Sequence, residues 1–327
     1  MAFRLKLKEP LGSGFTQIGL DEIERAIAEL RAAVDRTTAI HQARKAIKRI
    51  RSMLRLARAA IGEEAFRREN ARFRDIAQLL ASQRDAAVLA ETLAKLEARY
   101  GYEATRLVEE AGPALVASAR SGAHEAGSDD VSEALLRLEV ALSEWKELDF
   151  STLDLPSLQR GFATTYGQAQ RWSRRAFSRK SDEAFHDWRK WVQRHWRQLS
   201  LVEGAWPLYF AARIEEAKEL SDILGDDHDL SVLIARLEAA DRVRLKHAVA
   251  AALAQLARRR QKELRQLAKP HGDRLFAYDT AAFADRLGLY WQSARRMRKL
   301  KRREEREAAT APVTPTKTGD EPDLVDV

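Results

Sequence analysis

The stretch HQARKAIKRIRSMLRLAR, residues 41–58, contains seven Lys or Arg residues and no Asp or Glu. Its small and apolar residues recur three and four positions apart, which is the spacing of an α-helix with one buried face. Ala43, Ile47, Ile50 and Leu54 fall on that face, and the basic residues occupy the opposite side over roughly 25 Å. The stretch therefore predicts a helix that buries one side and presents a row of cations on the other.

The same spacing recurs along nearly the whole chain, whereas the alternation typical of strands is almost absent. Only residues 3–10, FRLKLKEP, could form a short strand. We predict an all-α fold, with Asp21 as the N-cap of its first helix. The expected helices cover residues 20–35, 38–60, 63–82, 85–99, 130–148, 157–178, 183–203, 208–224, 229–240, 242–268 and 280–303.

Two pairs of segments resemble each other at nearly the same offset. HQARKAIKRIRSML (41–54) matches HDWRKWVQRHWRQL (186–199) at an offset of 145 residues, and IAQLLASQRDAAVL (76–89) matches LSDILGDDHDLSVL (220–233) at an offset of 144. Because the order is also the same, we predict an internal repeat of two helical bundles. The expected boundaries are residues 13–148 for the first bundle, 157–303 for the second and 304–327 for a disordered acidic tail.

The composition describes a soluble, core-forming chain, with 45% hydrophobic and 32% charged residues. No run is long and apolar enough for a membrane span, which needs about 18 residues. The first residues, MAFRLKLKEPLGSG, lack the apolar centre of a secretory signal. The chain has no cysteine, which excludes disulfides, thiol nucleophiles and Cys-based zinc sites and is typical of a reducing cytoplasm.

The charge distribution indicates a polyanionic partner. The net charge is +8, but residues 304–327 contribute −5, so residues 1–303 hold +13. Like charges at i,i+4, such as Arg44 with Lys48 and Arg51 with Arg55, repel each other. Either acids on a neighbouring helix or a bound polyanion could relieve this repulsion, and we favour the polyanion because the planar guanidinium of Arg matches phosphate oxygens.

Two further basic stretches support this interpretation. Residues 171–180, RWSRRAFSRK, hold five cations, and residues 286–303, RLGLYWQSARRMRKLKRR, hold eight cations and no acid. The second stretch is either a solvated final helix or a basic helix that rests on a membrane or nucleic acid.

The motif H-x-x-R-K-x-x-[KQ]-R begins at His41 and again at His186, and L-x-x-x-R-D-x-x-V begins at Leu80. In these motifs, and over about residues 13–303, the chain resembles the CHAD domain, the conserved histidine α-helical domain. The resemblance implies two pseudo-twofold-related four-helix bundles around a basic central groove or pore. It also implies a protein that binds inorganic polyphosphate without catalysing a reaction and that associates with polyphosphate granules. No segment resembles the CYTH domain that accompanies some CHAD domains, so we expect a stand-alone member.

The resemblance also implies that the polyphosphate contacts lie on the cationic side chains of these motifs. Gln193 replaces Lys48 and Trp196 replaces Arg51, so we expect the second half to contribute fewer cations. No catalytic residue, metal ligand or cofactor is expected. The implied polyphosphate-binding residues are His41, Arg44, Lys45, Lys48, Arg49, Arg51, Arg55, Arg84, His186, Arg189, Lys190, Arg194, Arg197 and His228.

Three local features leave alternatives open. The acids of GDDHDL (225–230) could hold magnesium, but we interpret the segment as a tight turn in which Asp229 caps the next helix. Trp188 and Trp191 lie on the apolar arc, which favours core packing over base stacking, while Trp196 lies on the basic side. For the whole protein, the alternatives to polyphosphate binding are nucleic-acid binding and an enzyme that processes polyphosphate or triphosphate.

Overall fold

The computed structural model describes residues 3–32, 35–80, 85–122, 128–239 and 245–310. Over these ranges the fold is all-α, as predicted, and residues 3–10 form no strand. The side chains of Asp35, Asp154 and Ser181 cap α2, α7 and α8. The helices are α1 (Leu11–Arg31), α2 (Arg36–Ile61), α3 (Glu63–Leu79), α4 (Asp85–Tyr100), α5 (Tyr102–Gly122), α6 (Ser128–Lys146), α7 (Leu155–Arg179), α8 (Asp182–Val202), α9 (Pro207–Glu238), α10 (His247–Leu275) and α11 (Thr280–Thr310), with a short 3-10 helix, η1 (Glu203–Ala205), between α8 and α9.

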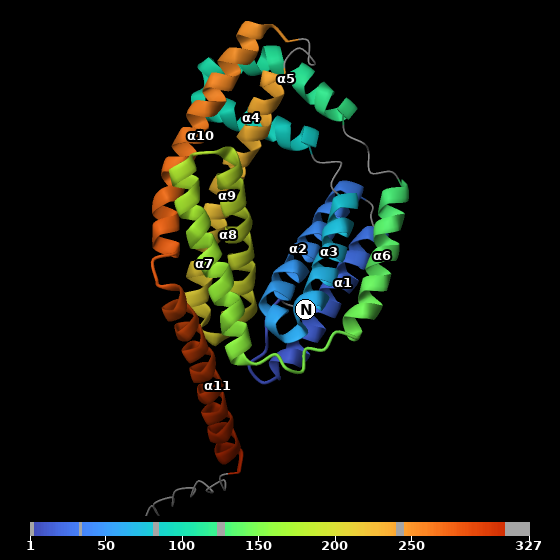
Figure 1. Ribbon diagram of the computed structural model, residues 1–327, viewed down its shortest axis with the longest axis vertical. Coiled ribbons are helices and arrows are strands. Elements are labelled where there is room, and N and C mark those ends of the chain that lie inside the picture. The colour runs from blue at the N-terminus through green and yellow to red at the C-terminus, as the bar shows by residue number, and fades with distance from the viewer. Residues whose placement is uncertain (1–2, 33–34, 81–84, 123–127, 240–244, 311–327) are drawn as a thin grey trace, which may run out of the picture.

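The helices gather in two halves that lie side by side (Figure 1). In the first half α1, α2, α3 and α6 pack together, and in the second half α7 and α8 pack against α9 and α11. One hydrophobic core runs through both, because α2 packs on α7 and α8; it includes Ile47 and Phe73 as well as Phe162 and Trp188. No helix of the described ranges has the length and apolar character that crossing a membrane requires.

A second, separate core lies at the far end of the molecule, where α4 and α5 reach over to α9 and α10 (Figure 1). Leu93 and Leu115 from the first half pack there with Leu233 and Leu253 from the second half. Helix α5, with Pro113 in its interior, was not among the expected helices. The first half therefore supplies a helical hairpin to the core of the second half.

Helix α1 begins at Leu11, so the prediction that Asp21 caps it is wrong. The segment before Asp21 is rich in glycine, which favours a loop, but tertiary packing requires these glycines inside the helix. A Cβ atom on Gly12 would lie 2.3 Å from the carbonyl oxygen of Phe150, and one on Gly19 would lie 2.1 Å from the indole of Trp145. The glycines let α1 pack closely against α6 and the residues that follow α6.

Substituting Gly19 by alanine should lower the free energy of unfolding by about 2 kcal/mol, since the added methyl group would overlap the fully buried ring of Trp145. Gly112→Ala is the matched control. Its Cβ would lie 3.6 Å from the nearest side chains, so this change should raise the free energy of unfolding by about 0.5–1 kcal/mol through helix propensity alone. Urea denaturation of both variants checks the contrast, and equal effects would show that Trp145 does not require a glycine beside it.

The segment GDDHDL, 225–230, lies inside the unbroken helix α9, so the predicted turn and the capping role of Asp229 are wrong. Gly225 is explained by packing, because a Cβ there would approach the guanidinium of Arg189 to 3.1 Å. Asp227 is buried and accepts a hydrogen bond of 2.7 Å from Arg265. These contacts keep the helix continuous through residues that favour turns when read alone.

The two ends of the described chain also differ from expectation in detail. Instead of a strand, the first residues pack along η1 and α8, where the backbone N–H of Leu5 donates to the carbonyl of Leu201 at 2.8 Å. Helix α11 continues to Thr310, seven residues beyond its predicted end at 303. The rest of the predicted tail, residues 311–327, lies outside the described residues.

Candidate functional site

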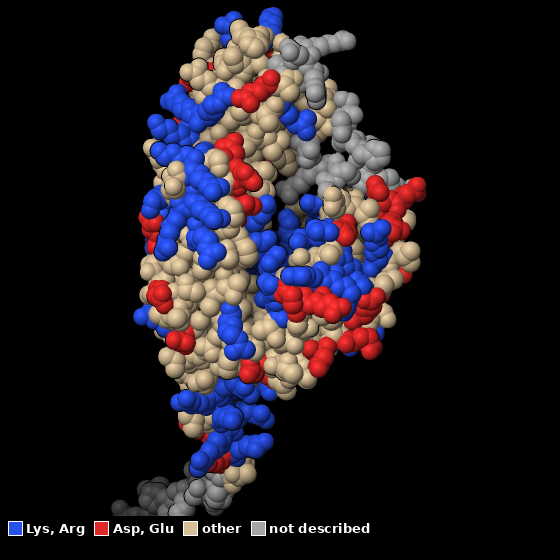
Figure 2. All heavy atoms as spheres, viewed as in Figure 1, with Lys and Arg blue, Asp and Glu red and all other residues tan. Residues whose placement is uncertain are grey.

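The two basic helices, α2 and α8, pack against each other between the two halves. At their buried crossing Gln198 Nε2 donates a hydrogen bond of 3.1 Å to the carbonyl of Ser52. Their apolar arcs enter the core, where Ile50, Leu54 and Val192 have no exposed surface. Figure 2 shows Lys and Arg atoms gathered where the surface is hollowed between the halves.

Three guanidinium groups meet at the centre of this face: Arg51 and Arg55 from α2 and Arg194 from α8. We call them the central arginine cluster. Burial, and then the charges of Arg55 and Arg51, lower the pKa of Arg194 to about 9. Burial, Arg51 and Arg58 lower the pKa of Arg55 to about 10. Among the described residues no carboxylate forms an ion pair with Arg55 or Arg194, and Asp187 offsets the lowering of the pKa of Arg194 only in part, so these charges are withdrawn from water with little compensation.

The ring of Trp191 contacts two arginines of the cluster. The guanidinium carbon of Arg194 lies 4.3 Å from the centroid of its ring, and that of Arg55 lies 5.5 Å away. Trp191 is partly buried against the core, whereas Trp188 is fully buried as predicted. A hollow of about 470 Å³ opens beside them and is lined by Arg55, Arg58, Gly161, Thr164, Gln168, Arg160 and Trp191, among others.

A second group of arginines lies further along the same helices. Arg197, one of the implied polyphosphate contacts, is only 8% exposed. Burial, and then Arg49 and Arg189, lower its pKa to about 10. Arg197 donates to the carbonyl of Gln193 within its own helix at 2.7 Å and lies over the ring of Trp196 at 4.3 Å.

Arg49, in contrast, has a buried acid as its partner. Its Nε donates to Glu22 of α1 at 2.6 Å, and Glu22 also pairs with Arg25 at 2.8 Å. Glu22 is only 1% exposed. A neighbouring helix thus supplies Arg49 with the acid that α2 itself lacks, as Glu63 of α3 also does for Arg58 at 2.5 Å.

Two of the three histidines among the implied contacts, His186 and His228, form a stacked pair. The rings of His186 on α8 and His228 on α9 lie 4.0 Å apart at an angle of 28°. Burial, His228, Lys190 and Arg189 lower the pKa of His186 to about 4, and burial with the same two cations lowers the pKa of His228. Both rings are therefore neutral at pH 7, and an anion bound beside them would favour their charged forms.

Because the pKa of His186 falls from an ordinary 6.5 to about 4 on folding, the unfolded chain binds a proton that the folded chain does not in this window. The free energy of unfolding should therefore drop by about 2 kcal/mol as the pH falls from 6.5 to 4. His186→Gln should flatten this slope, whereas replacing the exposed His247 with Gln should not. Urea denaturation between pH 4 and 7 checks the difference, and an unchanged slope in His186→Gln would contradict it.

The remaining predicted residues are more dispersed. Arg44 donates to the carbonyl of Ala77 on α3 at 2.9 Å, and Lys190 pairs with Asp187 at 2.8 Å. Lys45 and Lys48 are exposed on α2, with His41 partly buried in its first turns. Arg84 lies outside the described residues.

Sequence reasoning missed several residues of this region, chiefly Arg160 and the buried Glu22. Arg160 stands apart from the basic stretches and reaches the hollow only because α7 packs on α2. The one signal for Glu22 was an acid on the buried face of a predicted helix, a position where a carboxylate needs a cationic partner.

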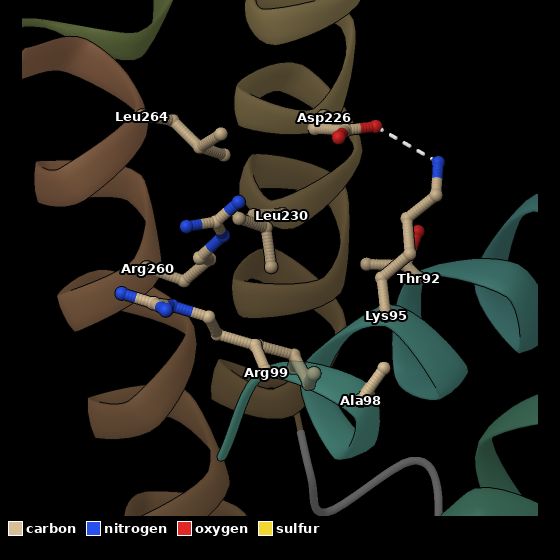
Figure 3. Close-up of a pocket in the computed structure, with 9 residues that line it drawn as sticks. Thr92, Lys95, Ala98, Arg99, Asp226, Leu230, Arg260 and Leu264 are labelled. Carbon is tan, nitrogen blue, oxygen red and sulfur yellow. Dashed lines mark hydrogen bonds and ion pairs between the residues drawn. The ribbon is translucent and has the colours of Figure 1, made fainter. Parts of the chain in front are cut away.

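A further hollow of about 320 Å³ lies between α4, α9 and α10 (Figure 3). Its cations are matched by acids: Lys95 pairs with Asp226 at 2.9 Å, and Arg99 and Arg260 each reach Glu263 at 3.0 Å. This hollow therefore lacks the uncompensated charge that distinguishes the central arginine cluster.

Within the described residues, the group whose ligand atoms lie close enough for a metal ion consists of Glu216, Glu219 and His271, and not of the GDDHDL acids. Glu216 accepts hydrogen bonds from Arg274 at 3.1 Å and pairs with Nδ1 of His271 at 2.8 Å. Its oxygens are thus already engaged in an ion-paired cluster between α9 and α10.

Comparison with known proteins gives one match. The family model of the CHAD domain matches residues 17–238, while no curated protein and no solved structure matches. The matched region includes both basic helices and ends with α9, so α10 and α11 lie beyond it.

Proposed function

The chain belongs to the CHAD domain family, and we propose that it binds inorganic polyphosphate between the cationic faces of α2 and α8. The CHAD domain is associated in general with the binding of polyphosphate or triphosphate. The specific ligand, and recruitment to polyphosphate granules through it, are our proposal. The proposed contacts are His41, Arg44, Lys45, Lys48, Arg49, Arg51, Arg55, Arg84, His186, Arg189, Lys190, Arg194, Arg197 and His228.

The observation that carries this proposal is the central arginine cluster. Folding brings Arg51, Arg55 and Arg194 together, although each repels the next and burial disfavours their charges. A bound phosphate chain would remove the repulsion and accept the guanidinium hydrogen bonds that water cannot fully supply. An arrangement that is unfavourable without a ligand is what a preorganised anion site requires.

Binding without catalysis is supported by the state of the nearby acids. Asp75 and Asp187, whose charges act on Arg51 and Arg194, are engaged with Arg74 and Lys190, each at 2.8 Å. Glu63, which lines the hollow, is engaged with Arg58 at 2.5 Å and Arg67 at 2.6 Å. A magnesium-dependent hydrolase needs several carboxylates free to hold the ion beside the phosphates. The paired acids here favour a binding module.

Competition binding tests the proposal. Long-chain polyphosphate is titrated into the protein at about 150 mM salt, where exposed charges are largely screened, and single- and double-stranded nucleic acids are then added as competitors. We expect tight polyphosphate binding that resists both competitors and collapses in the paired variants Arg44→Ala/Arg49→Ala and Arg189→Ala/Arg194→Ala. Equal competition by nucleic acid, or indifference to these four arginines, would overturn it, and release of phosphate during the titration would show an enzyme instead.

A further inference from the structure

The distal part of α11 carries the densest positive charge of the described chain outside α2. Residues 295–303, here called the basic arm, contain no acid, and every one of them is exposed. Figure 1 shows α11 running past the end of the second half, and Figure 2 shows Lys and Arg atoms covering that extension. The cations of the basic arm are Arg295, Arg296, Arg298, Lys299, Lys301, Arg302 and Arg303.

The basic arm is held to the body only at its base. Phe283, Leu287, Trp291 and Ala294 are buried against the rest of the molecule, and none of the residues beyond Ala294 whose burial is described is buried. Without a packed face, a helical segment has only its backbone hydrogen bonds and side-chain pairs to stabilise it.

Within the arm those side-chain pairs are repulsive. Arg295, Arg298, Lys299 and Arg302 stand three and four positions apart, where like charges destabilise a helix. The ion pair seen among the described residues of the arm is that of Arg303 with Glu307, at 2.6 Å. A polyanion along the arm would turn this repulsion into attraction.

The N-terminal segment lies between the arm and the central helices. Arg298 lines a hollow of about 370 Å³ together with three cations of the N-terminal segment and two acids; the lining includes Arg4, Lys6, Lys8, Glu9 and Asp21. Two of these cations have acidic partners, Arg4 in Glu203 at 2.6 Å and Lys6 in Glu9 at 3.2 Å. That segment begins at Phe3, whose ring lies 5.8 Å from the guanidinium carbon of Arg49. Arg49 in turn is close enough to Arg197 for its charge to lower the pKa of Arg197.

We propose that the basic arm is a second contact for the same polyphosphate chain that α2 and α8 bind, so that only long chains occupy both sites. This inference rests on the proposed function and adds a preference for chain length to it. Two linked contacts bind more tightly than either alone, because the second binding event becomes intramolecular. A short chain fills the central site and gains nothing from the arm.

The test compares two chain lengths in a variant of the arm. Arg295→Gln/Arg298→Gln/Lys299→Gln/Arg302→Gln removes four exposed cations, and Arg31→Gln/Arg106→Gln/Arg137→Gln/Lys146→Gln removes four exposed cations elsewhere as the charge-matched control. We expect the arm variant to lose roughly tenfold or more in affinity for chains of about 100 phosphates, and to bind chains of about 10 phosphates as the wild type does. The salt dependence of long-chain binding should flatten by up to about three to four ions.

The outcomes separate the two proposals. If the wild type binds neither chain length, the proposed function fails. If the wild type binds both but the arm variant matches the control on long chains, or loses equally on both lengths, the arm is not a second contact. If the arm variant keeps its polyphosphate affinity but loses binding to double-stranded nucleic acid, the arm serves nucleic acid and the inference is overturned. Far-UV circular dichroism of both variants checks that each is folded.

Discussion

Replacing Arg55 and Arg194 with methionine will weaken polyphosphate binding by about 100-fold and at the same time raise the free energy of unfolding by about 1–3 kcal/mol. The depressed pKa values of both side chains, about 10 and about 9, show that folding opposes their charges. Methionine keeps the apolar contact with Trp191 and removes the repulsion. The protein would thus become more stable as it loses its ligand.

Urea denaturation and isothermal titration with long-chain polyphosphate measure the two effects in the same preparation. Arg31→Met/Arg137→Met is the matched control, because these exposed arginines already pair with acids outside the site, Glu139 at 2.5 Å and Glu133 at 2.6 Å. The control should change stability by less than about 1 kcal/mol. If the double variant of Arg55 and Arg194 loses stability along with affinity, the cluster stabilises the fold and is not a preorganised anion site.

Glu22→Ala is expected to lower the free energy of unfolding by about 3–5 kcal/mol. The carboxylate is almost fully buried and accepts from Arg49 at 2.6 Å and Arg25 at 2.8 Å, so its loss removes the acid that pairs with the partly buried Arg49. Polyphosphate at 100 times its dissociation constant should return about 2.7 kcal/mol, because it binds only the folded state and supplies anionic oxygens to Arg49.

Thermal and urea unfolding with and without polyphosphate check both parts of this result. Glu24→Ala serves as the control, because Glu24 is exposed and lies two residues further along α1. Its free energy of unfolding should stay within about 0.5 kcal/mol of the wild-type value. Should Glu22→Ala unfold like the wild type, the buried pair with Arg49 would not contribute to stability.

The all-α fold could be predicted from the sequence because helical spacing of apolar residues is a local property. Where the prediction failed, a distant contact overrode a local preference: Gly12 and Gly19 fit inside α1 because Phe150 and Trp145 lie against them. Gly225 lies inside α9 because Arg189 needs the space. Turn propensity says nothing about such neighbours.

The sequence predicts which types of residue form the candidate site, but it does not predict which cations have an acidic partner. The row of cations on α2 and its counterpart on α8 are visible in the sequence, and so is the histidine that opens each motif. Which arginine has an acid is decided by packing between helices, so the sequence could not separate Arg49, paired with Glu22, from Arg194, which lacks such a partner. The stacking of His186 on His228 likewise depends on how α8 meets α9.

The hairpin of α4 and α5 decides whether the two halves can exist apart. Leu89, Leu93 and Leu115 of the first half share a core with Leu233 and Leu253 of the second, so cutting the chain between α6 and α7 would expose apolar surface on both fragments. We therefore expect that neither half folds on its own and that the chain unfolds in one cooperative transition. The packing of this hairpin fixes the spacing between the two halves in the absence of a ligand.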